Sequence, residues 1–180
     1  VFIIVSSIVG LFVVYKVNTG ELAINNPIIS YLKFDDYWGT FRGYVWRACL
    51  EEYSQLSFIH KIFGTGPDTF GIYMVTDLAR QNDMYMTGQI FDSAHNEYLQ
   101  YLFTVGPIGL IAYLTALLST VYALIKQGIN NKYMLAVAML IMCYMAQAVV
   151  NINLPISTPI FWAFLMIAKA MLRKDNTNQK

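Results

Sequence analysis

Three long apolar runs, separated by short polar turns, occupy the C-terminal part of this 180-residue chain. They cover about residues 101–125, 133–150 and 156–172, and the turns between them are Lys126–Lys132 and Asn151–Pro155. A helix that crosses a bilayer needs about 20 predominantly apolar residues. These runs therefore predict an all-α fold in which a polytopic bundle of transmembrane helices forms the framework.

A fourth apolar run opens the chain. Residues Val1–Tyr15 are almost wholly apolar, but they fall short of the ~20 residues that a bilayer crossing requires. We predict a truncated transmembrane helix over residues 1–16. A secretory signal peptide is the competing interpretation, although no basic segment precedes the run and no clear small-x-small cleavage site follows it.

The composition agrees with a membrane protein. Hydrophobic residues make up 57% of the chain and charged residues only 13%, with a mean hydropathy of +0.46. An ordinary soluble domain has about a quarter of its residues charged. No basic stripe with interleaved aromatic residues appears, which argues against nucleic acid as a partner.

The charges are divided unevenly along the chain. Residues 17–100 carry five basic and ten acidic side chains, whereas the remainder carries seven basic side chains and a single acidic one, Asp175. Loops rich in lysine and arginine stay on the cytoplasmic side of a membrane. We therefore predict that Lys126, Lys132 and a tail over residues 173–180 are cytoplasmic, and that residues 17–100 form an extracytoplasmic loop.

Two segments of this loop suggest a site. From Phe41 to Leu56 apolar residues recur at helical spacing, which predicts an amphipathic helix with Arg42 and Trp46 on one face. The structural alternative for Arg42, without a role in a site, is an ion pair with Asp35 or Asp36. The segment Phe63–Phe70 holds Gly64 and Gly66, which permit close backbone approach to a ligand, or a plain turn that ends the preceding helix at Gly64.

The polar segment that leads into the first long apolar run contains His95. Either Asp92 or Ser93 is a candidate N-cap, which would put His95 in the first helical turn. The positive end of a helix dipole disfavours a second positive charge there, so we expect a neutral imidazole that can accept a proton. The alternative is that His95 is an interfacial polar residue that caps a transmembrane helix.

Three motifs occur in order in this region. His95-Asn96 is followed after nine residues by Gly106-Pro107-Ile108-Gly109, and upstream stand Arg42-x-x-x-Trp46 and Gly64-Thr-Gly66-x-x-x-Phe70. This order resembles the motifs of the O-antigen ligase and O-antigen polymerase superfamily of bacterial envelope enzymes. The resemblance covers about residue 37 to the end of the chain. Members of that family are about twice as long, so we expect this chain to be the C-terminal part of a larger protein and to be inactive alone.

The resemblance implies a GT-C-like helix bundle in the cytoplasmic membrane of a bacterium. It also implies glycosyl transfer, without a metal or cofactor, from an undecaprenyl-diphosphate-linked glycan to an acceptor hydroxyl, in the synthesis of a cell-surface polysaccharide such as lipopolysaccharide or capsule. Such a reaction needs a base for the hydroxyl proton and a cation for the departing diphosphate. The residues it assigns are His95 and Arg42 as catalytic groups, and Arg47, Asn96, Gly64 and Gly66 as substrate-binding groups.

Several alternatives remain open at this point. Ligases, repeat-unit polymerases and protein O-glycosyltransferases share these motifs. A function of another class is a non-enzymatic polytopic membrane protein, such as part of a transporter, whose acidic loop binds a partner or solute. No metal site is predicted, because no cluster of His, Cys, Asp and Glu has ligand spacing.

Overall fold

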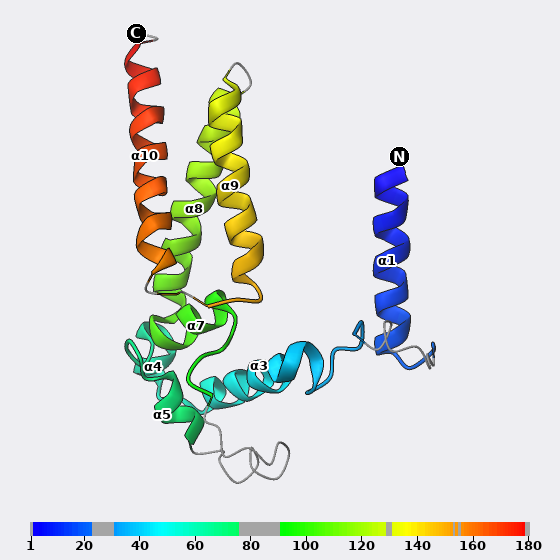
Figure 1. Ribbon diagram of the computed structural model, residues 1–180. Coiled ribbons are helices and arrows are strands. Elements are labelled where there is room, and N and C mark those ends of the chain that lie inside the picture. The colour runs from blue at the N-terminus through cyan, green and yellow to red at the C-terminus, as the bar shows by residue number, and fades with distance from the viewer. Residues whose placement is uncertain are drawn as a thin grey trace. The chain divides into compact units, whose positions relative to one another are not determined.

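A computed structural model of the chain describes residues 2–22, 31–75, 91–128, 131–152, 154 and 156–178. In these residues the regular elements are helices, with no strand, so the predicted all-α class is confirmed (Figure 1). The chain divides into two compact units, Val1–Ala48 and Cys49–Lys180. The boundary between the units falls within helix α3 (Trp38–Gln55).

The first unit begins with α1 (Phe2–Asn18), close to the predicted range of 1–16. Its described apolar side chains are largely exposed, among them Leu11 and Phe12. Asn18 ends the helix and holds the chain that follows: its side-chain amide donates to the Leu32 carbonyl at 2.9 Å, and its Oδ1 accepts from the Phe34 backbone N–H at 2.8 Å. A long apolar helix thus leads directly into a hydrogen-bonded loop.

Helix α3 follows an irregular start. Gly39, Thr40 and Phe41 all have left-handed backbone angles, and regular helix begins only after them. The regular part matches the helix predicted from Phe41 to Leu56. Its buried side chains share one face, as expected for an amphipathic helix, and they are Tyr44, Val45, Ala48 and Cys49.

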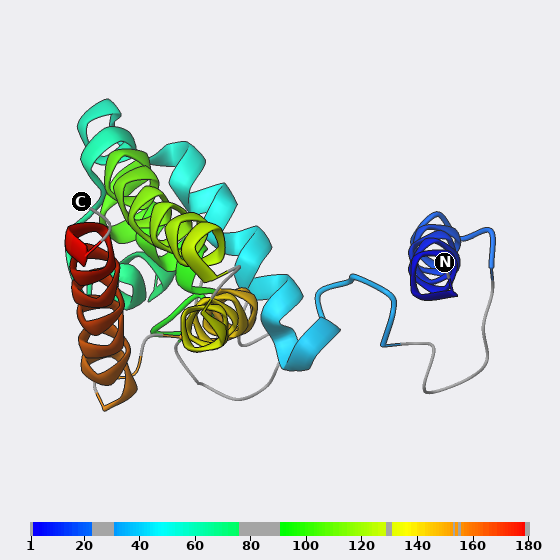
Figure 2. The ribbon, with the colours of Figure 1, turned by 90° about the horizontal axis from the view of Figure 1, so that it is seen from above.

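The second unit contains three long helices that lie side by side (Figures 1 and 2): α8 (Gly106–Gly128), α9 (Lys132–Ala148) and α10 (Ser157–Asn178). Three short helices gather at the end of this bundle where α8 begins: α4 (Phe58–Phe63), α5 (Phe70–Met74) and α7 (Glu97–Thr104). The core of the bundle consists of apolar side chains from all three long helices, including Leu117, Leu124, Ala138, Ile141, Leu165 and Ala168.

One described helix, α8, is long and apolar enough to cross a membrane. At 1.5 Å per residue its 23 residues measure roughly 34 Å, slightly more than the ~30 Å hydrocarbon core of a bilayer. The predicted span over 101–125 was wrong at its start, because the helix is broken at Val105 and Gly106 has a positive φ of 78°. Helix α9 matches the predicted 133–150 within two residues, and α10 continues beyond the predicted end at residue 172 into the tail.

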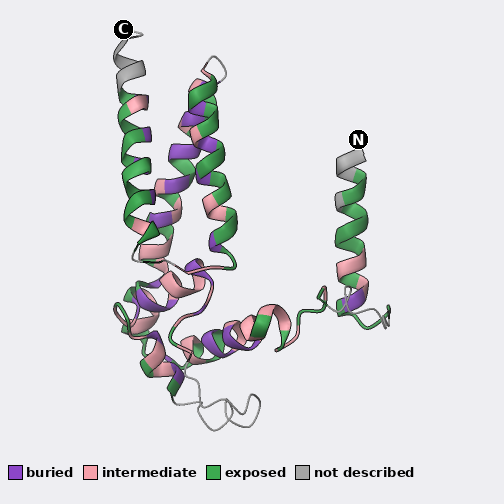
Figure 3. Ribbon diagram, viewed as in Figure 1, coloured by how far each residue is buried: buried purple, intermediate pink, exposed green. Residues whose placement is uncertain are grey.

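The long helices have exposed faces, drawn green in Figure 3, and these faces carry many large apolar side chains. Exposed large side chains occur along all three helices, including Ile111, Leu118, Leu135, Met139, Phe164 and Met166. A soluble protein rarely exposes so extended an apolar surface without a partner. Lipid, or further helices, would cover these faces more favourably than water does.

Candidate functional site

His95 lies just before α7 rather than inside it. The helix begins at Glu97, so the prediction that His95 occupies the first helical turn was wrong, and so was the N-cap at Asp92 or Ser93. His95 has a left-handed backbone with φ of 47°, a conformation in which histidine is several-fold enriched among non-glycine residues. Its side chain is half-buried. The imidazole is therefore carried on a sharp turn at the entrance to the helix.

Asn96 is the N-cap of α7. Its Oδ1 accepts from the backbone N–H groups of Tyr98 at 3.0 Å and Leu99 at 3.1 Å, and its backbone is extended. The residue is 7% exposed, and its side chain satisfies two of the N–H groups that have no partner within the helix. Sequence reasoning missed this cap although the signal was present, since asparagine directly before an acidic residue is a typical helix start.

The glycine motifs meet backbone to backbone. The N–H of Thr65 donates to the Phe103 carbonyl at 3.0 Å, and the N–H of Gly66 donates to the Thr104 carbonyl at 2.9 Å. A Cβ on Gly106 would lie 2.3 Å from the Ile62 carbonyl oxygen, a distance that no real Cβ tolerates. Two segments about forty residues apart in the sequence are thus joined at a junction that has no room for a side chain at Gly106.

Gly64 belongs to the same junction. It caps the end of α4 with φ of 78°, and a Cβ there would lie 2.3 Å from the Thr104 carbonyl oxygen. The plain turn that was the alternative interpretation of Gly64 is thus what the structure contains. The predicted role of Gly64 and Gly66 in substrate binding stays a prediction, and their N–H groups already donate to carbonyls of His60 and Thr104.

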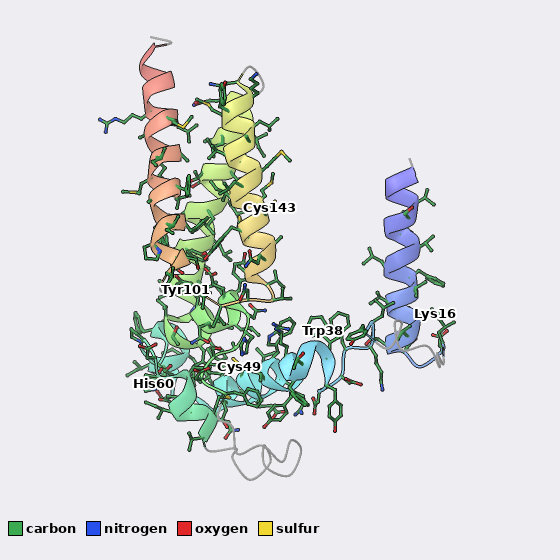
Figure 4. The ribbon with its side chains drawn as sticks, viewed as in Figure 1. Lys16, Trp38, Cys49, His60, Tyr101 and Cys143 are labelled. Atoms are coloured by element: carbon green, nitrogen blue, oxygen red, sulfur yellow. The ribbon has the colours of Figure 1, made fainter. Side chains whose placement is uncertain are left out.

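Glu97 is a buried acid that sequence reasoning missed. It is 2% exposed, and it accepts hydrogen bonds from the hydroxyls of Tyr113 on α8 and Tyr144 on α9, the latter at 3.0 Å. The ring of Tyr113 stacks on that of Tyr101, with centroids 4.6 Å apart (Tyr101 is labelled in Figure 4). The carboxylate therefore ties the start of α7 to two long helices of the bundle.

Tyr98 adds a further tie. Its hydroxyl donates to the Met145 carbonyl on α9 at 2.7 Å. Burial, and next the negative charge of Glu97, raise the pKa of Tyr98, so the hydroxyl remains a donor at neutral pH. With Asn96, Glu97 and Tyr98 all bonded inward, the first turn of α7 is rigidly set immediately after His95.

Arg42 belongs to the first unit. Its Nη1 donates to the Gly39 carbonyl at 2.8 Å, and its Nε is buried without a hydrogen-bond partner among the described residues. The predicted alternative, an ion pair of Arg42 with Asp35 or Asp36, was wrong in the described part of the chain. The left-handed residues Gly39–Phe41 stand directly before it, so this arginine too follows a strained turn.

Arg47 forms the ion pair instead. Its Nε and Nη2 donate to the two carboxylate oxygens of Asp36, at 3.0 Å and 2.5 Å, in a bidentate arrangement. Gly43 permits this contact, because a Cβ there would lie 1.9 Å from the Asp35 carbonyl oxygen. Arg47 is thus held by the turn at Asp35–Asp36, which makes it a weaker candidate for phosphate binding than Arg42.

The two cysteines are not paired in a disulfide, and Cys49 lacks the character of a nucleophile. Both are free, and Cys49 is buried whereas Cys143 is exposed on α9 (both labelled in Figure 4). Burial raises the pKa of the Cys49 thiol to about 12, so the reactive thiolate is scarce at neutral pH. In the described residues no group of three or more His, Cys, Asp and Glu side chains is placed to hold a metal ion.

The structure therefore brings Gly64, Gly66 and Gly106 together and sets Asn96 beside His95, all in the second unit. Arg42 and Arg47 belong to the first unit. Comparisons of the chain with protein-family models, with curated proteins and with solved structures each found no match.

Proposed function

We propose that this chain is part of a multi-pass glycosyltransferase of the O-antigen ligase or polymerase type. It would work at the outer face of a bacterial cytoplasmic membrane and transfer an undecaprenyl-diphosphate-linked glycan onto an acceptor hydroxyl. The observation that carries the proposal is the glycine junction, in which Gly64–Gly66 and Thr104–Gly106 bond backbone to backbone directly beyond the helix that His95-Asn96 opens. Motifs that occurred together in the sequence by chance would not be expected to form hydrogen bonds with each other in the fold.

The chemistry assigns one role to each group. His95 accepts the proton of the acceptor hydroxyl as the oxygen attacks the anomeric carbon, and the bond from that carbon to the diphosphate breaks. Arg42 stabilises the negative charge that the departing diphosphate gains, because a guanidinium stays protonated and binds phosphate oxygens through parallel hydrogen bonds. The Nε of Arg42 has no hydrogen-bond partner among the described residues, so this guanidinium keeps an unused donor.

Membrane location is supported by the helices. Helix α8 meets the length and apolarity required for a crossing, and α9 and α10 pack along it with apolar outward faces. Lys126 lies in the last turn of α8, Lys132 begins α9 and Arg173 lies in the last two turns of α10. These helix ends lie opposite α4, α5 and α7 in the bundle (Figure 1). By the positive-inside rule that end would face the cytoplasm and the His95 end would face outward.

The test compares the lipid-linked glycans of a strain deleted for the full-length gene with those of strains complemented by wild type, His95→Ala and Arg42→Lys. Accumulated single repeat units would indicate a polymerase, and accumulated long lipid-linked chains a ligase. We expect both variants to fail to restore the wild-type profile while their membrane insertion is unchanged. Full restoration by both would refute the assigned roles and favour a non-enzymatic membrane protein.

A further inference from the structure

A pocket of about 380 Å³, lined by both polar and apolar groups, lies in the second unit beside the segment that carries His95. Helix α7 forms one wall with Gln100 and Thr104, and the segment before the helix contributes Asp92 and Ser93. Asp68, from the turn after the glycine motif, contributes a second carboxylate. None of these residues belongs to the set that sequence motifs indicate.

The polar groups of this pocket are mostly unused by the protein. Among the described residues, the side chains of Asp68, Asp92 and Ser93 make no hydrogen bond or ion pair, and the Ser93 hydroxyl is buried as well as unpartnered. The side-chain amide oxygen of Gln100 accepts a hydrogen bond from the Ala94 backbone N–H at 2.9 Å, which leaves the side-chain NH₂ group of Gln100 to donate elsewhere. A buried hydroxyl without a partner costs free energy unless something binds it.

We propose that this pocket binds a neutral, polyhydroxylated ligand, namely the sugar of the acceptor glycan. Carboxylates accept hydrogen bonds from sugar hydroxyls, while the NH₂ group of Gln100 and the hydroxyl of Ser93 supply donors. Pro67 and Ile152 add apolar wall against which the C–H face of a sugar can pack. The mixture of donors and acceptors matches a ligand whose hydroxyls are both.

The charge of the pocket indicates whether it binds the acceptor glycan or the diphosphate-linked glycan that is transferred. Two carboxylates line the pocket, and no lysine or arginine does. A diphosphate would be repelled there, so the pocket suits a glycan free of phosphate. Because Ser93 is two residues from His95, the two backbones are at most about 7 Å apart, so the pocket lies close to the segment that carries the imidazole. This assignment to the acceptor, as distinct from sugar binding itself, rests on the proposed function.

The test uses the full-length protein in nanodiscs of phosphatidylcholine, because glycosidic detergents carry sugar headgroups that would compete. The probe is an array of unmodified neutral and N-acetylated oligosaccharides. We expect at least one of them to bind, and binding to weaken about tenfold or more in Ser93→Ala and in Asp92→Asn. Ser119→Ala on α8 and Glu51→Gln on α3 are matched controls on exposed positions, and they should bind as wild type does.

Three outcomes would overturn the inference: no oligosaccharide binds, the pocket variants bind as tightly as wild type, or pyrophosphate displaces the bound sugar. Asp68→Asn is a second pocket variant, since asparagine tolerates the positive φ of 56° at that residue. The proposed function can be refuted independently of sugar binding in the pocket. If His95→Ala still supports transfer while the pocket variants lose sugar binding, the pocket stands as a carbohydrate site and the catalytic assignment falls.

Discussion

Two neighbouring residues of the His-Asn motif are used in different ways. Asn96 is turned onto the backbone of α7 and satisfies two of its free N–H groups, whereas His95 makes no contribution to the helix. A motif residue near a site is readily taken for a substrate ligand. Here the amide oxygen of Asn96 already accepts two hydrogen bonds, and only its NH₂ group remains for a substrate.

Replacing Asn96 separates these roles. Asn96→Ala should lower the free energy of unfolding by about 1 kcal/mol, because the N-cap is lost, and the thermal midpoint of the full-length protein should fall. Asn96→Asp keeps the cap and should keep the midpoint. If the aspartate variant is stable but fails in glycan transfer, Asn96 also contacts the substrate; if it is as unstable as the alanine variant, the capping role is wrong.

Gly106 is a position where any side chain is costly. Gly106→Ala should destabilise the protein by about 2 kcal/mol or more, since it combines a positive φ with a collision against the Ile62 carbonyl oxygen. Gly10 in α1 is the control: a Cβ there meets nothing within 4 Å, and alanine has the better helix propensity. Unfolding midpoints of both variants decide the matter, and equal midpoints would contradict the close approach at the junction.

At the scale of elements, the bundle is held by apolar residues of different sizes from all three long helices. Ala138 on α9 is fully buried, whereas Ala136, two residues earlier on the same helix, is exposed. Ala138→Leu should therefore destabilise the protein by about 1–3 kcal/mol through overpacking. Ala136→Leu should leave the unfolding midpoint unchanged. A reversed order would mean that the faces of α9 are assigned the wrong way round.

Apolar runs predicted where most helices lie, because burial or lipid contact demands an unbroken stretch of apolar residues. They did not predict the break between α7 and α8, since hydropathy carries no information about backbone angles. The pair Gly106-Pro107 was the available signal: glycine permits the positive φ, and proline suits the first turn of a helix.

The candidate site was predictable only in part. The turn at Gly64 follows from local sequence, but Glu97 looked like one more charge in an acidic loop. Its burial depends on Tyr113 and Tyr144, which lie 16 and 47 residues away. Contacts over such distances leave no trace in spacing, so the sequence alone could not reveal them. The pocket beside α7 was missed for the same reason, because its walls come from four separated segments.

At the scale of the whole molecule, the long helices of the second unit expose apolar side chains on their outward faces, which is the pattern expected of helices surrounded by lipid. Cys143 reports on this directly. It is exposed about two thirds of the way along α9, so in aqueous surroundings a water-soluble maleimide would react with it readily. In native membranes we expect no labelling of Cys143 by a polar maleimide, and labelling after solubilisation in denaturing detergent.

The controls isolate that signal. Cys49→Ala removes the other thiol of this chain, and Cys143→Ala identifies any labelling at sites elsewhere in the full-length protein. Rapid labelling of Cys143 in sealed native membranes would mean that this face of α9 meets water. The outward apolar faces would then need a protein partner rather than lipid.

The hydrogen bond from Thr65 to Phe103 closes a loop whose ends are 38 residues apart. The entropy lost in closing a flexible loop grows only with the logarithm of its length, by about 0.6 kcal/mol for each doubling. An insertion that doubled this loop would therefore cost less than a single alanine at Gly106. The length of the segment between Thr65 and Phe103 can therefore change at little cost in free energy, whereas the glycines at the junction cannot be replaced so cheaply.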